Sequence, residues 1–271
     1  MKTTLFRGAS ILPYGAMQDS FYPLNFDAFF ALIRLETEDK SPEYFQMRRL
    51  LALAAIAAVS GCTETSDPGP GTLPDLKHDP ILFVHGYGGS SANWTTMRQR
   101  FADDGWQDLE LYAYNYSFVS SNATTAAEIR DHVNDIIAQT GATKVDIIAH
   151  SMGSVSSRYY LKNLDGSSKI DAWVSLAGPN HGTDAVENQN CGFTPCREIV
   201  PGSAFLIALN GGDETPGLTR YATWRSPCDT TINPDESVIL AGATNTLTAC
   251  IVHFNFLLDA TVYQQVRGFV E

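Results

Sequence analysis

The chain has 271 residues, 44% of them hydrophobic, and its 30 acidic against 18 basic side chains give a net charge of −12. That length suffices to bury a sizeable core in one domain. The acidic balance excludes nucleic acid as an expected partner and offers no electrostatic attraction to anionic lipid. No Cys/His spacing is typical of a zinc site, and acidic pairs such as Asp103-Asp104 are expected at the surface, so no metal is predicted.

The segment 47–61 is predicted to be an export signal. A basic segment, Met47-Arg48-Arg49, precedes the apolar run 50–59 and then Ser60-Gly61-Cys62. This order of regions is typical of a secretory signal peptide over 47–61, and the run falls short of the roughly 20 residues that span a bilayer. Because a signal peptide normally starts a protein, residues 1–46 are interpreted as an upstream extension from an earlier start codon, absent from the native protein.

The cysteine that ends this signal indicates how the protein is attached. Val59-Ser60-Gly61-Cys62 resembles a bacterial lipoprotein cleavage box, which makes Cys62 the predicted lipidated residue; the alternative is ordinary cleavage that leaves a free thiol. Residues 62–78 are polar and contain Pro and Gly, as in a flexible tether. The predicted location is therefore the cell envelope, through the lipid on Cys62, or the secreted fraction.

Residues 79–271 alternate between predicted strands and helices. Strands are expected over 80–84, 109–114, 145–148, 172–176 and 219–224, with strand-like character over 237–241, and helices over 124–140 and 260–269. Helices between strands imply a parallel sheet covered on both faces, with functional residues at the carboxyl ends of the strands. The fold class is therefore α/β, in one catalytic domain.

A serine follows one of these strands at a sharp turn. Ser151 stands in Ala149-His150-Ser151-Met152-Gly153, between a buried strand and a helix-compatible stretch. A hydroxyl in this position is held clear of its neighbours, and small residues two before and two after allow close packing. Ser151 is therefore the candidate nucleophile, although an ordinary serine at a helix start would give a similar short pattern.

A glycine-rich segment follows the first strand of the domain. His85-Gly86-Tyr87-Gly88-Gly89 comes directly after residues 80–84. Backbone N–H groups exposed at such a strand end can bind the oxyanion of a tetrahedral intermediate, together with the N–H of the residue after the nucleophile. The expected donors are the backbone amides of Tyr87 and Met152.

Only two histidines follow Ser151, and chain order favours the second. Strand-turn-helix hydrolases run Ser, acid, His along the chain. His181 leaves no room for a strand and an acid after the serine, so His253 is the predicted base and His181 is predicted to be structural, hydrogen-bonded in its loop.

The predicted acid is Asp229, which follows the strand 219–224 on a loop. A disulfide between Cys228 and Cys250 would fasten the acid loop to the base loop and hold the carboxylate at hydrogen-bond range. The competing carboxylates, which are more simply explained as solvated loop residues, are Asp213, Glu214, Asp235 and Glu236. With Cys62 removed, four cysteines remain, and the pairing with the shortest loops joins Cys191 with Cys196 and Cys228 with Cys250.

From residue 80 onward these motifs resemble the small bacterial triacylglycerol lipases of the α/β-hydrolase superfamily (class 2-like), a group that includes secreted actinobacterial enzymes. Beside the serine and histidine-glycine motifs, the resemblance is carried by three segments: 176–183 (LAGPNHGT), 227–229 (PCD) and 239–245 (ILAGATN). Alanine at position 149 is typical of this group. The resemblance implies an α/β-hydrolase fold with a compact parallel sheet flanked by helices, and hydrolysis of acylglycerol esters by Ser151, Asp229 and His253, with no cofactor.

Substrate choice is less constrained than the reaction. Five side chains close to the motifs are candidates for an acyl groove or, equally, for the core: Tyr87, Trp94, Phe118, Met152 and Phe254. The alternative functions are a short-chain carboxylesterase or acyltransferase with the same residues, and a non-catalytic, lipid-binding surface lipoprotein. The expected partner is an acylglycerol or another lipid ester, and the protein is expected to be a monomer.

Overall fold

The computed structural model describes residues 73–185 and 190–271. The predicted upstream extension, the signal peptide and the lipidated cysteine therefore lie outside the described residues, as does the tether up to residue 72. These described residues belong to one compact unit. No helix among the described residues is both long enough and apolar enough to cross a membrane.

A six-stranded parallel sheet forms the centre of this unit. Its spatial order is β2-β1-β3-β4-β5-β6, and every neighbouring pair is parallel. The strands are β1 (Ile81–Val84), β2 (Leu111–Ala113), β3 (Val145–His150), β4 (Ile170–Leu176), β5 (Arg220–Arg225) and β6 (Thr244–Leu247). All residues of β1 and β3 are buried, as a strand covered on both faces requires.

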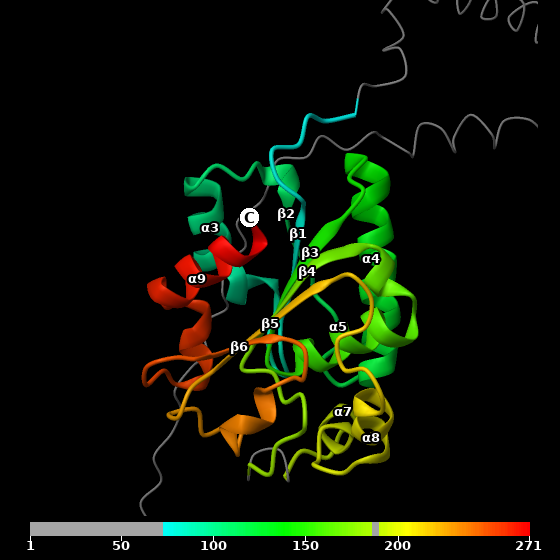
Figure 1. Cartoon of the computed structure of the whole chain (residues 1–271), viewed down its shortest axis with the longest axis vertical. Coiled ribbons are helices and arrows are strands. Elements are labelled where there is room, and N and C mark those ends of the chain that lie inside the picture. Colours follow the sequence, from blue (N-terminus) through cyan, green and yellow to red (C-terminus); the bar gives the residue numbers. More distant parts are fainter. Residues whose placement is uncertain (1–72, 186–189) are drawn as a thin grey trace, which may run out of the picture. The chain divides into compact units, whose positions relative to one another are not determined.

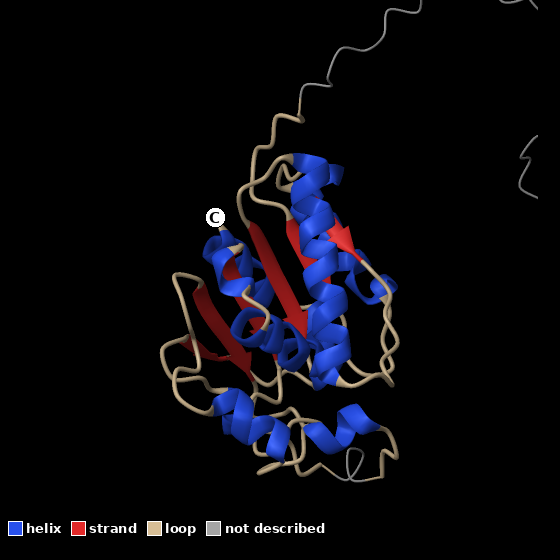
Figure 2. Ribbon diagram, turned by 90° about the vertical axis from the view of Figure 1, so that its right-hand side faces the viewer, coloured by secondary structure: helices blue, strands red, loops and turns tan. Residues whose placement is uncertain are grey.

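Helices cover both faces of the sheet. Helices α4 (Asn122–Thr140) and α5 (Met152–Asn163) lie on one face, and α3 (Thr95–Asp103) and α9 (Ala260–Val270) lie on the other (Figures 1 and 2). Two hydrophobic clusters, one on each side of the sheet, form the core. The α/β-hydrolase fold predicted from the sequence is confirmed by this arrangement.

Helix α4 shows how local sequence sets an element. Its N-cap Ser121 accepts a hydrogen bond from the Thr124 amide, and Gly141 ends the helix with a left-handed φ of 73°. The buried side chains recur at helical spacing, with Ala126, Ile129 and Val133 among them. The predicted helix over 124–140 therefore begins two residues earlier than expected and ends as predicted.

The segment 237–241, predicted to be strand-like, is not a strand. It belongs to a 3₁₀ turn, Asp235–Val238, and the loop that follows it. Val238 and Leu240 are buried in the two hydrophobic clusters, so the apolar pattern reflects their burial and not a strand. The strand that follows, β6, is polar and mostly exposed because it forms the edge of the sheet.

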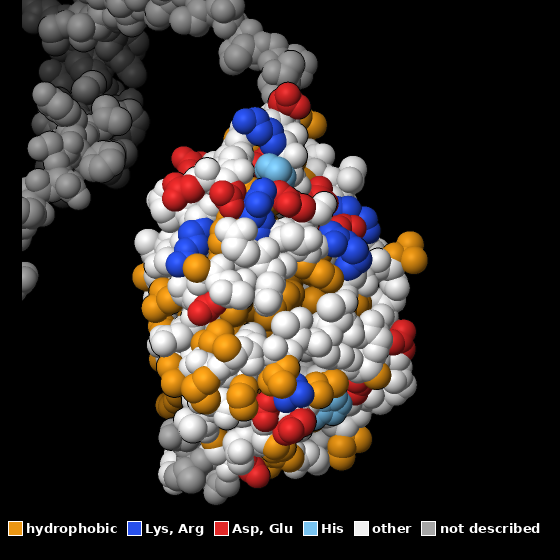
Figure 3. All heavy atoms as spheres, turned by 60° about the vertical axis from the view of Figure 1, so that its left-hand side comes forward, with side chains coloured by type: hydrophobic (Ala, Val, Ile, Leu, Met, Phe, Trp, Pro, Cys, Tyr) orange, Lys and Arg blue, Asp and Glu red, His pale blue; other side chains and the backbone are white. Residues whose placement is uncertain are grey.

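The segment 109–114 contributes a shorter strand than predicted. A 3₁₀ turn, Asp108–Glu110, precedes β2 because the buried Glu110 carboxylate accepts hydrogen bonds from the amides of Gln107 (2.7 Å) and His78 (3.0 Å). The His78 ring also stacks on Trp106, with centroids 3.8 Å apart. Residues just before β1 thus pack on the domain at the amino ends of the strands. Charged side chains gather around this end on the face shown in Figure 3.

The opposite end of the sheet carries the loops and two short helices. Helices α7 (Thr194–Glu198) and α8 (Ala204–Asn210) lie beyond the carboxyl ends of the strands (Figure 1). Both follow β4 in the chain, and α7 lies at the pocket beside Ser151 together with the loops after β1, β4 and β5.

Candidate active site

Ser151 occupies a strained turn between β3 and α5. Its φ of 54° and ψ of −132° lie outside the regions that non-glycine residues usually adopt, a conformation that costs on the order of 1–3 kcal/mol. The turn is held because the Ser151 amide donates to the Leu176 carbonyl of β4 at 2.9 Å. Gly153 permits the close approach of α5 to β1, since a Cβ there would lie 2.3 Å from the His85 carbonyl oxygen.

The loop after β1 lies against this turn. A Cβ on Gly86 would come within 2.7 Å of the Ser151 Cβ, so only glycine allows the contact. His85 fixes the loop from within: its Nδ1 is 2.9 Å from the Gly86 carbonyl oxygen, and its ring stacks on Tyr116 at 3.9 Å. Burial lowers the pKa of His85, which favours the neutral ring with a proton on Nδ1.

Asp229 and His253 form a hydrogen-bonded pair. His253 Nδ1 lies 2.8 Å from Asp229 Oδ2, and the two side chains are 16% and 2% exposed. The other carboxylate oxygen, Oδ1, accepts from the amides of Thr231 (2.9 Å) and Ile232 (3.1 Å). With Nδ1–H donated to the carboxylate, the neutral His253 ring presents the Nε2 lone pair, which is the state a general base requires.

The residue before the serine joins this pair to the turn. His150 Nε2 is 3.0 Å from the His253 carbonyl oxygen, and the two imidazole rings lie 4.7 Å apart. Asp229 and His253, which are 78 and 102 residues after Ser151 in the chain, are thereby brought to the same end of the sheet as the serine.

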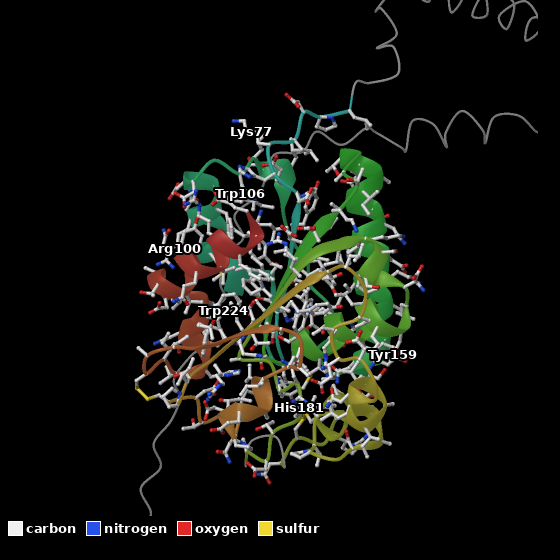
Figure 4. The ribbon with its side chains drawn as sticks, in the orientation of Figure 1. Lys77, Arg100, Trp106, Tyr159, His181 and Trp224 are labelled. Atoms are coloured by element: carbon white, nitrogen blue, oxygen red, sulfur yellow. A yellow bond between two sulfur atoms is a disulfide. The ribbon has the colours of Figure 1, made fainter. Side chains whose placement is uncertain are left out.

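The other candidate histidine pairs elsewhere. His181 Nε2 lies 2.7 Å from Glu214, and the His181 amide donates to the Ser237 carbonyl. Figure 4 labels His181 on the loop side of the molecule, opposite to Lys77. Of the competing carboxylates, Glu214 is thus engaged with His181, and Asp235 pairs with Arg225 at 2.5 Å.

Both predicted disulfides are present. Cys228–Cys250 joins the loop that carries Asp229 to the segment that precedes His253, and Cys191–Cys196 closes a short loop at the start of α7. A second contact joins the same two loops as the first bridge, because Ser226 Oγ accepts from the Ile251 amide at 2.8 Å.

A largely apolar pocket opens beside Ser151. Its cavity volume is about 100 Å³, and its lining residues are Tyr87, Ser151, Met152, Thr183, Cys191, Cys196, Ile199, Thr231 and Ile232. Tyr87 and Met152, whose backbone amides are the expected oxyanion donors, therefore lie at the pocket together with the serine. The rest of the lining is Thr183, Cys191, Cys196, Ile199, Thr231 and Ile232. Thr183 stands in the motif 176–183 and the two cysteines were predicted as a disulfide, but nothing in the sequence assigned any of these residues to a pocket.

The other groove candidates lie outside this lining. Trp94 is fully buried in the core cluster that contains residues of α3 and α9, so of its two alternatives, groove or core, the structure places it in the core. Phe118 packs edge-on against Tyr87 at 5.2 Å, and the half-exposed Phe254 meets the His150 ring at 6.0 Å.

One group of carboxylates among residues 73–185 and 190–271 is close enough to be considered as a metal site. Asp79, Asp146 and Asp171 have oxygens within 4.8 Å of one another, at the amino ends of the strands and away from Ser151. Arg220 forms an ion pair with Asp171 at 2.6 Å, so a basic side chain already neutralises part of this group.

Comparison with known proteins finds lipases among the sequences most similar to this chain. A triacylglycerol lipase from Pseudomonas fragi is 29% identical over 150 residues, which are 51% of this chain and 50% of that protein. A triacylglycerol lipase from Burkholderia plantarii is 30% identical over 121 residues, 40% of this chain and 33% of that protein. The chain thus spans half the length of these relatives or less.

Solved structures share the fold at low sequence identity. The mature lipase BlEst2 of Bacillus licheniformis superimposes with a TM-score of 0.62 at 16% identity, covering 73% of this chain and 94% of that one. Lipase B of Aspergillus fumigatus gives a TM-score of 0.60 at 15% identity, covering 72% of this chain and 53% of that one. The family model for lipase (class 2) matches residues 78–246, more than half of the sequence, and the chain therefore belongs to the class 2 lipase family.

Proposed function

We propose that this protein is a triacylglycerol lipase: a serine hydrolase that cleaves the carboxylic esters of acylglycerols through an acyl-enzyme on Ser151. The observation that carries the proposal is the His253–Asp229 hydrogen bond of 2.8 Å beside a serine on a strained strand-to-helix turn. The curated relatives named above are triacylglycerol lipases, which supports the same substrate class.

The first half of the reaction forms the acyl-enzyme. Ser151 Oγ attacks the ester carbonyl carbon while its proton passes to His253 Nε2, and Asp229 stabilises the imidazolium that results. The amides of Tyr87 and Met152 donate to the oxyanion; losing one such donor typically costs about 3 kcal/mol of transition-state stabilisation. The carbon–oxygen bond to the alcohol then breaks, and His253 Nε2 returns the proton to the departing alkoxide.

The second half releases the acid. Water gives a proton to His253 Nε2 as its oxygen attacks the acyl carbonyl, and the collapse of the second tetrahedral intermediate returns that proton to Ser151 Oγ. No cofactor takes part in either half, because both need only proton transfer and stabilisation of the oxyanion.

The pocket gives weight to an ester with an apolar acyl group. Met152, Ile199 and Ile232 supply an apolar wall beside Ser151. The cavity of about 100 Å³ is also the observation that favours the second candidate, a carboxylesterase or acyltransferase for short acyl chains, because a long chain would extend beyond it. A non-catalytic, lipid-binding role has no comparable support, since it leaves the strained serine and the His–Asp pair without a use.

The test is a series of emulsified triacylglycerols of increasing acyl length, assayed with wild-type protein and with Ser151→Ala. We expect titratable fatty acid from the wild type, none above background from the variant, and unchanged thermal unfolding. Labelling of Ser151 by an alkyl phosphonate, read as a mass increase, should accompany activity. Hydrolysis that persists in Ser151→Ala would refute the mechanism, and turnover of short soluble esters alone would favour the esterase.

We also propose that the domain is exported and held at the cell envelope by a lipid on Cys62, and that it acts as a monomer. The two disulfides support an oxidising location. The intact mass of the membrane-extracted protein tests the anchor: we expect a chain that begins at Cys62 and carries acyl groups. A secreted chain with an unmodified Cys62, or one that retains residues 1–46, would contradict the proposal.

A further inference from the structure

His150 is a buried titratable residue to which the proposed mechanism gives no role. It is the last residue of β3, directly before Ser151, and its side chain is 4% exposed. Its hydrogen bond and ring contacts are with the base loop: the carbonyl oxygen of His253, the ring of His253 and the ring of Phe254. His85, in the loop after β1, lies close enough to lower its pKa further.

The charge state of His150 follows from these surroundings. Burial, and then the nearby His253, lower its pKa to about 3, so the ring is neutral at any pH at which the enzyme would work. A carbonyl oxygen can only accept, so Nε2 carries the single proton and donates it to the His253 carbonyl across 3.0 Å. A neutral ring also adds no repulsion when His253 becomes an imidazolium 4.7 Å away.

Ile251, Phe256 and Leu257, which flank His253, are buried in the hydrophobic cluster on the α3 and α9 side of the sheet. The base loop is also attached to the acid loop by covalent and polar contacts. The Cys228–Cys250 bridge and the hydrogen bond from the Ile251 amide to Ser226 Oγ join the segment before His253 to the loop that carries Asp229. Both contacts hold the base relative to the acid, and neither reaches β3. The hydrogen bond from His150 to His253 runs directly from the strand of the nucleophile to the backbone of the base.

We propose that His150 is a positioning residue that sets the distance between Ser151 and His253 through its Nε2–H donor, independently of the His253–Asp229 pair. This inference rests on the proposed serine hydrolysis. A base that moves by about 1 Å loses on the order of 100-fold in rate, because proton transfer needs hydrogen-bond range. The acid–base pair, held by the disulfide, stays intact when the donor of His150 is lost.

Two substitutions of equal length separate the donor from the packing. His150→Gln keeps an N–H group near the position of Nε2, and His150→Met fills similar space without a donor. We expect kcat on a soluble p-nitrophenyl ester to fall roughly 100-fold in His150→Met, with little change in KM, and less than 10-fold in His150→Gln. The low-field proton resonance of the His253 Nδ1–H, which reports the bond to Asp229, is expected in both variants.

The proposal is overturned if His150→Met retains the wild-type kcat, if the two variants lose the same amount of activity, or if the low-field resonance disappears in His150→Met. The rate at which an alkyl phosphonate labels Ser151, measured by intact mass, gives the same comparison without any ester substrate. A wild type that is labelled by the phosphonate but hydrolyses no acyl ester would count against the proposed function alone, and the ratio of the labelling rates of the two His150 variants would still decide this inference.

Discussion

Asp229→Asn is the substitution with the most specific consequence, because the structure determines how the new amide must lie. Asp229 Oδ1 accepts from the Thr231 and Ile232 amides, at 2.9 and 3.1 Å. Only the carbonyl oxygen of an asparagine can accept these two bonds. The NH₂ group of the asparagine must then face His253 Nδ1, where Asp229 Oδ2 now lies at 2.8 Å.

This orientation forces the wrong tautomer on the base. A facing NH₂ group needs the Nδ1 lone pair of His253, so the proton of the neutral ring moves to Nε2, which can no longer accept the proton of Ser151. Flipping the amide to restore the tautomer leaves two amide donors unsatisfied, at roughly 1–3 kcal/mol each. Two unsatisfied donors together cost about 2–6 kcal/mol, which corresponds to a kcat that is about 30-fold to 10⁴-fold lower. The lost stabilisation of the imidazolium moves the expected decrease toward 10⁴-fold.

The assay is steady-state hydrolysis of a p-nitrophenyl ester, with Glu214→Gln as the matched control. Glu214 forms the other histidine–carboxylate pair at this end of the sheet, 2.7 Å from His181. We expect Glu214→Gln to keep kcat within about 3-fold of the wild type, since its carbonyl oxygen can still accept from the Ala241 amide and the partly exposed contact with His181 lies away from the proposed triad. A kcat for Asp229→Asn above a tenth of the wild-type value, or an equal loss in Glu214→Gln, would refute the reasoning.

Two further substitutions test the packing and the electrostatics of the fold. Gly153→Ala places a Cβ 2.3 Å from the His85 carbonyl oxygen and 2.8 Å from that of Val84, so we expect this variant to lose about 1–3 kcal/mol of unfolding free energy and most of its activity. The control is Gly268→Ala in α9, where nothing lies within 4 Å of the new Cβ; it should leave activity unchanged and raise stability slightly. Equal melting temperatures for the two variants would contradict this prediction. Asp146→Asn should stabilise the protein increasingly as the pH rises, because burial, and then Asp79 and Asp171, hold the pKa of Asp146 well above its usual range. The folded state therefore keeps this proton more tightly than the unfolded chain, and wild-type stability falls as the pH rises from the unfolded pKa through the folded one. Thermal unfolding between pH 4 and 9 should show a gain of about 1 kcal/mol, roughly 2–4 °C, near neutral pH, against an unchanged difference for the exposed Asp131→Asn; a gain that shrinks with rising pH would contradict it.

Short sequence patterns predict those features of the fold that depend on neighbouring residues, such as strands, helix ends and tight turns. Buried parallel strands produce continuous apolar runs, and Gly141 ends its helix in a conformation that favours glycine. The same physics predicts the turn at Ser151, because a small residue must stand at 153 if α5 is to pack on β1. It fails at 237–241, where loop side chains buried in the core give an apolar pattern without strand pairing.

Contacts between segments that are distant in the sequence are harder to predict from short patterns. The choice of Asp229 over its competitors came from its place after a strand and from its neighbour Cys228; the hydrogen bond to His253 spans 24 residues within one pair of loops. By contrast, no periodicity or spacing in the sequence predicts that His150 contacts the backbone of a residue 103 positions later, nor that Thr183, Cys191, Cys196 and Ile199 line a pocket. Such contacts depend on how whole loops lie over the sheet, which is decided by packing of the complete domain.

Contacts between neighbouring residues hold the serine, and contacts between distant segments hold the acid and the base. The nucleophile is held by its own strand and helix, in a turn whose strain the surrounding backbone maintains. The acid and base lie on two loops that a covalent bridge joins to each other. A rigid serine and a rigid acid–base pair can still be misplaced relative to one another, since the chain between them includes two strands and the segment around the pocket. A direct hydrogen bond from residue 150 to residue 253 removes that freedom where the proton must pass, and this explains why a histidine with no part in the chemistry stands beside the serine.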